Sequence, residues 1–110
     1  MHLTYRNRRW HTKWSQYTSN NANALILVAD DDGTMIKAST NVDEINGPAV
    51  LAVKNWSENA GMAKALADAE IIEPEASYFI PSGRVNVPVY YLTAKGREDL
   101  LTQRAVGIRA

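Results

Sequence analysis

The last third of the chain places two strand-like runs between two helix-like segments, and this order limits the possible folds more than any other feature. An alanine-rich segment ends at Ile71-Ile72, the turn sequence Pro81-Ser82-Gly83-Arg84 separates two apolar runs, and Thr93 can cap a final helix. Proline and glycine mark such a turn because each suits backbone angles that other residues avoid. The pattern predicts the order helix, strand, turn, strand, helix over residues 60–101.

A second hairpin is predicted nearer the N-terminus. The apolar run at residues 24–29 is followed by Asp30-Asp31-Asp32-Gly33 and then by a second run at residues 34–39. An Asp-Gly step between two such runs favours a tight turn, because glycine readily adopts the positive φ angle that the turn needs.

The segment between the two hairpins predicts a pair of helices. Gly47-Pro48 suits a helix start, because proline is well tolerated at the first helical position. The predicted elements are a capped turn at residues 42–45, one helix at residues 49–56 and a second helix at residues 58–70.

The N-terminal segment interleaves basic and aromatic residues. Trp10, Trp14 and Tyr17 are spaced i, i+4, i+7, which predicts one apolar face of a helix. One interpretation is nucleic-acid binding, since the arginines of this segment can neutralise phosphate while indole rings stack on bases. The shared face favours the other interpretation, in which the aromatic side chains pack on the core and the arginines are solvated or paired with acids.

Composition and charge narrow the function classes. The 110 residues suit one domain, and twelve basic side chains balance twelve acidic ones, which counts against a dedicated nucleic-acid binder. The absence of cysteine excludes disulfides, thiolate catalysis and cysteine-ligated zinc. His2 and His11 are the only histidines, and without a clustered carboxylate pair the sequence predicts no metal site and no other cofactor.

Other sequence signals argue against an enzyme and against a membrane protein. The chain has no phosphate-binding loop, no dinucleotide fingerprint and no serine, histidine and acid grouping, so we expect no catalytic residues. Its N-terminus is polar, and no apolar run has the length of a membrane span. We therefore expect a cytoplasmic protein without a membrane partner.

The acidic turn carries a further resemblance. Leu25–Val28 followed by Asp30-x-Asp32-Gly33-Thr34 resembles the first motif of the haloacid dehalogenase phosphatases. In that family the first aspartate is the nucleophile and the second a general acid, with magnesium nearby, and Asp30 and Asp32 would carry these roles. Such a domain also needs a parallel sheet, a later lysine and a downstream acidic pair, and 110 residues without such a pair cannot supply them. An acidic hairpin turn is therefore the interpretation that we favour.

A helix pair followed by a two-stranded hairpin resembles the winged helix-turn-helix domain. The phrase Tyr91-Leu92-Thr93-Ala94-Lys95-Gly96 is similar to the strand-to-helix closure of regulators of the multiple-antibiotic-resistance and phenolic-acid-repressor types. The resemblance covers roughly residues 48–101 and implies an α+β, winged-helix-like fold with an additional N-terminal hairpin. We expect a basic and aromatic segment at residues 1–23, one domain at 24–103 and a tail at 104–110.

The winged-helix resemblance implies a small, non-enzymatic DNA-binding regulator or accessory factor. The helix at residues 58–70 would enter a major groove, and the turn of the second hairpin would contact the DNA backbone or minor groove. A homodimer would fit the two half-sites that such regulators usually bind. The predicted nucleic-acid-binding residues are Arg6, Arg8, Arg9, Asn59, Lys64, Arg84 and Asn86.

The alternative function is a protein-interaction module, of the accessory or inhibitory kind that a phage or mobile element uses. The helix at residues 58–70 carries three acidic residues against Lys64 alone, whereas phosphate contact requires positive charge. A protein partner would bind this acidic helix or exposed aromatic side chains of the second hairpin. Core packing across the hairpin is the other role open to these aromatics, which are Tyr78, Phe79, Tyr90 and Tyr91.

Overall fold

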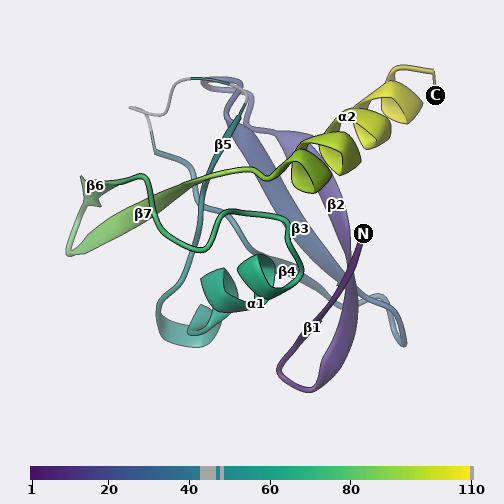
Figure 1. The fold of residues 1–110 in the computed structure, drawn as a ribbon, viewed down its shortest axis with the longest axis horizontal. Coiled ribbons are helices and arrows are strands. Elements are labelled where there is room, and N and C mark those ends of the chain that lie inside the picture. The colour runs from purple at the N-terminus through teal and green to yellow at the C-terminus, as the bar shows by residue number, and fades with distance from the viewer. Residues whose placement is uncertain (43–46, 48, 110) are drawn as a thin grey trace.

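The described part of the protein contains two antiparallel sheets and two α-helices (Figure 1). The computed structural model describes residues 1–42, 47 and 49–109, and it describes side chains as far as Arg104. The first sheet joins four strands in chain order, and the second has the order β5-β7-β6. The first sheet comprises β1 (His2–Tyr5), β2 (Arg8–Gln16), β3 (Asn23–Ala29) and β4 (Met35–Lys37). The second comprises β5 (Val50–Ala52), β6 (Tyr78–Ser82) and β7 (Val85–Tyr91). A 3₁₀ turn at Ser57–Asn59 precedes helix α1 (Met62–Asp68), and helix α2 (Ala94–Arg109) follows β7.

The winged-helix-like fold expected from the sequence is wrong. The first helix of the predicted pair, at residues 49–56, is replaced by strand β5, which pairs antiparallel with β7. All three β5 residues are buried, and a short continuous apolar run does not distinguish a buried strand from a helix. Pro48 and most of the predicted turn at residues 42–45 lie outside the described residues.

The second helix of the predicted pair is much shorter than the expected span of residues 58–70. Helix α1 begins only at Met62, because Gly61 at φ 85° is left-handed and separates it from the preceding turn. Asn55, which precedes the helix in sequence, caps its first turn, since the Asn55 Oδ1 accepts a hydrogen bond from the backbone N–H of Ala63 at 2.9 Å. A helix of seven residues is short for one that fills the major groove of DNA.

The N-terminal segment is a β-hairpin and not the predicted helix. Trp10 and Trp14 are four residues apart, an even step that also puts them on one face of a strand. In β2 these two residues and Thr12 are buried, whereas the residues between them are more exposed. The connecting turn, Arg6-Asn7, has φ angles of 53° and 61°, as a two-residue type I′ hairpin turn requires.

The elements predicted from local signals are present. The hairpin expected at residues 24–39 is formed by β3 and β4, with Gly33 at φ 75°, and the C-terminal hairpin by β6 and β7. Thr93 caps α2, because its Oγ1 accepts a hydrogen bond from the backbone N–H of Gly96 at 3.0 Å. Helix α2 continues to Arg109, beyond the predicted start of the tail.

The two sheets and both helices share one main core. It joins Trp10, Trp14, Leu25 and Leu27 of the first sheet to side chains from β5, α1, α2 and the segment that follows α1. A second, smaller cluster lies on the other side of the second sheet and includes Val50, Ala52, Ile80, Val87 and Val89. Strands β5 and β7 are therefore covered on both faces, while β6 and its turn project away from the first sheet (Figure 1).

Candidate functional site

Three aromatic side chains are exposed on the projecting β6–β7 hairpin. Tyr78 is 36%, Phe79 60% and Tyr91 51% exposed. Tyr78 and Phe79 belong to β6, which lies at the edge of its sheet, and Tyr91 ends β7. Because successive strand residues point to opposite faces, Tyr78 and Phe79 present apolar surface on both sides of the hairpin. We call these three residues the aromatic hairpin surface.

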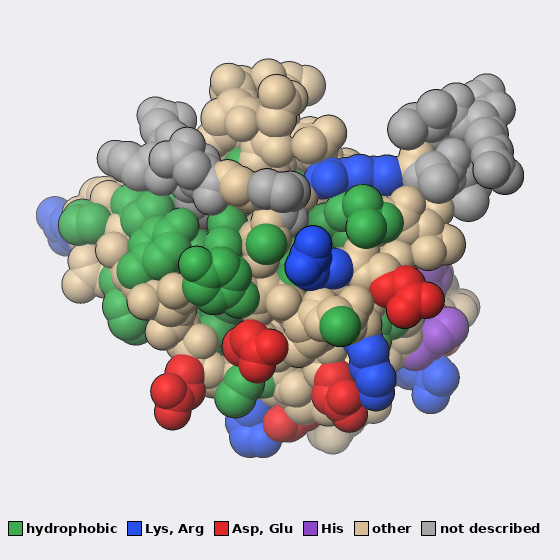
Figure 2. Space-filling model, turned by 45° about the horizontal axis from the view of Figure 1, so that its top comes forward, with side chains coloured by type: hydrophobic (Ala, Val, Ile, Leu, Met, Phe, Trp, Pro, Cys, Tyr) green, Lys and Arg blue, Asp and Glu red, His purple; other side chains and the backbone are tan. Residues whose placement is uncertain are grey.

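Tyr78 and Tyr91 share one face of the hairpin. Tyr78 lies directly opposite Val89, and Tyr91 is two residues further along the same strand, so the two tyrosines are diagonal neighbours. Figure 2 shows hydrophobic side chains gathered over the second sheet, with acidic side chains along one border. Glu73 lies beside this face, since its backbone N–H donates to the carbonyl oxygen of Tyr91 at 2.9 Å. Glu73 and Glu75 are exposed, and neither forms an ion pair within the described part of the chain.

Phe79 lies on the opposite face, at a shallow depression. The depression has a volume of about 460 Å³. Phe79 lies opposite Pro88, which also lines the depression with Trp56 and Tyr90. Tyr90 itself is 9% exposed, and burial raises the pKa of its phenol, so it belongs to the core rather than to the exposed aromatics.

The three arginines predicted to contact nucleic acid are engaged within the protein. The acidic turn after β3 lies beside Arg8 and Arg9 and offsets their charge. Arg8 pairs with Asp31 and with Asp32 at 2.8 Å each, Arg9 lies 3.3 Å from Asp30, and Arg6 donates to the carbonyl oxygen of Glu58.

The other four predicted nucleic-acid contacts lie on the 3₁₀ turn, on α1 and on the β6–β7 hairpin. Asn59, the predicted base reader, is 4% exposed and donates to the carbonyl oxygen of Lys37 at 2.6 Å. Lys64 is exposed and pairs with Asp68 at 2.7 Å. Arg84 and Asn86 are exposed on the β6–β7 hairpin, so the structure does not gather the seven residues on one surface.

The acidic sequence after β3 forms a hairpin turn, as we favoured over a phosphatase motif. It joins two antiparallel strands, not the parallel strands that the phosphatase fold requires. Asp32 Oδ1 accepts the backbone N–H of Thr34 at 2.9 Å. Hydrogen bonds from the backbone and hydroxyl of Thr34, together with the charge of Arg8, lower the pKa of Asp32 to about 2.

The structure brings together three residues that the sequence analysis did not join, His2, His11 and Asp30. The signal that could have found the histidine pair is the two-residue turn Arg6-Asn7, which places position 2 opposite position 11. Asp30 follows β3, the neighbour of β2, and is therefore at the same end of the sheet. Predicting a helix for this segment hid the pairing.

No family model, curated protein or solved structure matches this chain. Within the described part of the chain, no helix combines the length and apolar character needed to cross a membrane.

Proposed function

We propose that the chain is a non-enzymatic protein-interaction module that binds a partner protein through the aromatic hairpin surface. The observation that carries this proposal is the exposure of Tyr78, Phe79 and Tyr91 on a projecting edge hairpin. Aromatic side chains are enriched in protein interfaces, because they contribute large apolar area at little cost in conformational entropy. Tyr78 and Tyr91 are diagonal neighbours on one face and Phe79 lies on the other, so the hairpin presents aromatic surface on both of its sides.

The charges beside the hairpin indicate the chemistry of the partner. Glu73 and Glu75 flank the tyrosine face, and neither pairs with a basic side chain in the described part of the chain. Complementary charge steers association and suppresses wrong partners. We therefore infer a partner segment that carries an apolar anchor flanked by lysine or arginine.

Side chains, rather than the strand edge, make the contacts in this proposal. Strand β6 is an edge strand, but Pro81 lies within it and has no N–H to offer a further strand. Proline in an edge strand disfavours the addition of another strand. The aromatic rings thus supply the affinity, and the two glutamates supply the preference for basic segments.

DNA binding remains a prediction, now limited to Arg84 and Asn86 on the same hairpin. The paired arginines of the N-terminal hairpin and the zero net charge give it less support than the aromatic surface gives to protein binding. We keep the cytoplasm as the expected compartment, since a chain without cysteine needs no oxidising environment.

Selection from a displayed library of random peptides tests the proposal. We expect the enriched peptides to pair apolar with basic residues, and Phe79→Ala or Tyr91→Ala to weaken the best peptide about 30-fold, as truncation of an interface anchor does. The affinity is measured by fluorescence anisotropy on the folded variants.

The matched control is Leu101→Ala, since Leu101 is 59% exposed on α2 and lies outside the hairpin. It should leave the peptide affinity unchanged. Equal affinities for all variants, or enrichment of acidic peptides, would contradict the proposal. So would tight binding to duplex DNA that weakens with salt and depends on Arg84, or self-association through Phe79 in sedimentation.

A further inference from the structure

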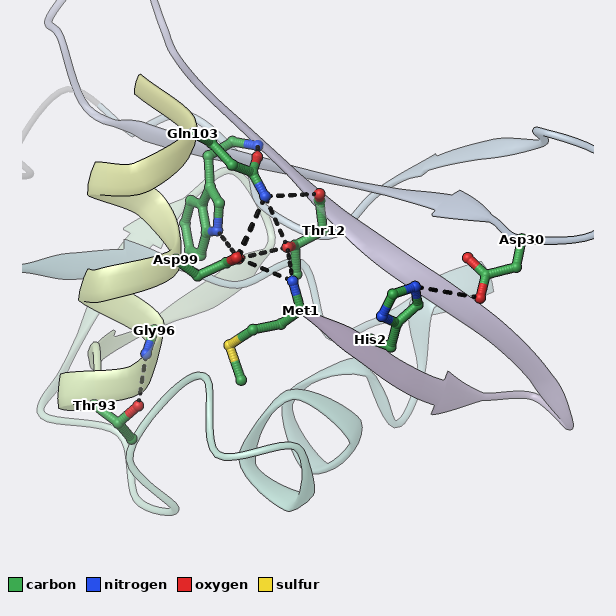
Figure 3. Close-up of polar contacts among 9 residues, drawn as sticks. Met1, His2, Thr12, Asp30, Thr93, Gly96, Asp99 and Gln103 are labelled. Carbon is green, nitrogen blue, oxygen red and sulfur yellow. Dashed lines mark hydrogen bonds and ion pairs between the residues drawn. The ribbon is translucent and has the colours of Figure 1, made fainter. Parts of the chain in front are cut away.

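We propose that His2, His11 and Asp30 form a binding site for one divalent transition-metal ion, with Zn²⁺ as the natural occupant. The three residues lie at the outer face of the first sheet, away from the aromatic hairpin surface, so this site is independent of the proposed function. Figure 3 shows the His2 ring directed toward the carboxylate of Asp30.

Three neighbouring strands position the three side chains. His2 and His11 are direct partners across β1 and β2, and their ring centroids lie 5.9 Å apart. Asp30 follows β3 directly, and its backbone N–H donates to the carbonyl oxygen of Arg9 at 3.0 Å. The sheet thus fixes all three backbones, and only side-chain rotation remains free.

The donor atoms lie close to the spacing that a metal requires. His11 Nδ1 is 2.7 Å from one carboxylate oxygen of Asp30, and His2 Nε2 is 3.6 Å from the other. One donor atom from each residue lies within 4.8 Å of the others. Ligands in a tetrahedral zinc site are about 3.3 Å apart. Side-chain exposures of 52%, 43% and 29% leave the rings and the carboxylate free to make this adjustment without disturbing the core.

The donor set selects a class of metal. Two imidazole nitrogens and one carboxylate oxygen suit zinc and its neighbours, whereas calcium and magnesium prefer oxygen ligands alone. Three protein ligands leave a fourth position that water can fill.

Arg9 competes with the metal for Asp30. Its Nε lies 3.3 Å from Asp30 Oδ2, and its positive charge opposes a bound cation. The Arg9 side chain is 68% exposed and can move into solvent when a metal binds. Removing its charge should therefore tighten metal binding, which a purely structural hydrogen-bond cluster would not explain.

Calorimetric titration of the untagged full chain with Zn²⁺ at neutral pH tests this site. We expect one ion per chain, a loss of affinity of about tenfold or more for His11→Ala and for Asp30→Asn, and severalfold tighter binding for Arg9→Gln. Ser15→Ala is the control, because Ser15 is exposed on the same face of β2 and should change nothing. The chain has two histidines and no cysteine, so no second site with such ligands can mask the result.

The imidazole ¹⁵N resonances of both histidines provide a second measurement. They should shift on addition of Zn²⁺ and not on addition of Mg²⁺. His2→Ala, at the exposed end of β1, replaces His11→Ala if the latter does not fold. The absence of saturable binding, or an affinity that is unchanged in these variants, would overturn the assignment.

Discussion

Replacing Gly96 by alanine is expected to destabilise the fold by about 3 kcal/mol, although the same change normally stabilises a helix. Gly96 is buried in the first turn of α2, and a Cβ atom there would overlap the carbonyl oxygen of Ile71. That carbonyl cannot easily move, because the backbone N–H of Thr93 also binds it at 3.1 Å. The contact joins the start of α2 to the segment that follows α1.

Urea denaturation of Gly96→Ala measures this effect as a shift of the midpoint. Arg97→Ala is the control, since the next residue is exposed and its substitution should change stability by less than about 0.5 kcal/mol. A Gly96→Ala variant as stable as the unsubstituted protein would show that α2 does not approach Ile71 this closely.

The second large effect concerns Asp99, the carboxylate that joins α2 to the first sheet. Its side chain is 13% exposed and accepts hydrogen bonds from Thr12 Oγ1 at 2.5 Å, Trp14 Nε1 at 2.8 Å and the amino group of Met1 at 3.0 Å (Figure 3). Asp99→Ala leaves Thr12 Oγ1 and Trp14 Nε1 without this acceptor and the Met1 amino group without its counter-charge, and should cost about 3 kcal/mol. Urea denaturation measures the loss, and Asp68→Ala, at an exposed ion pair, should change stability far less.

The same carboxylate should make stability depend on pH. Burial alone would raise the pKa of Asp99, but hydrogen bonds from Thr12, the Met1 amino group and Trp14 outweigh it and lower the pKa. A lowered folded-state pKa stabilises the protein above the ordinary carboxyl pKa of about 3.9, and the contribution is lost as the pH falls through the folded-state value. Below about pH 4, the unsubstituted protein should therefore lose stability more steeply than Asp99→Asn. Parallel curves of unfolding free energy against pH would contradict this role.

Local signals predicted the turns and caps of this fold, and long-range pairing decided the rest. The turn at Gly33 and the cap at Thr93 depend on residues adjacent in sequence, and both are present. The spacing of Trp10 and Trp14 fits a helix and a strand equally, and only pairing with β1 and β3 selects the strand. Likewise β5 is a strand because β7 lies beside it, which the run Val50–Ala52 cannot indicate alone.

The candidate sites likewise depend partly on local sequence signals and partly on long-range strand pairing. Exposed aromatics on the second hairpin were among the sequence alternatives, but the separation of buried Tyr90 from exposed Tyr91 required the sheet. The histidine pair could be found only after the N-terminal hairpin was known, since His2 and His11 are nine residues apart and meet only across its strands. The pairing of Arg8 with the acidic turn depends on the same hairpin and on β3.

The order of strands in the second sheet has a consequence for how the chain folds. Each pair in the first sheet joins consecutive strands, whereas β5 must find β7, so that Val50 pairs with Tyr91. Contacts distant in sequence form slowly, because a long loop must close before they contribute. We therefore expect the N-terminal meander to form first, with β5 awaiting its neighbour. During synthesis this apolar strand would stay without its partner until β7 emerges from the ribosome.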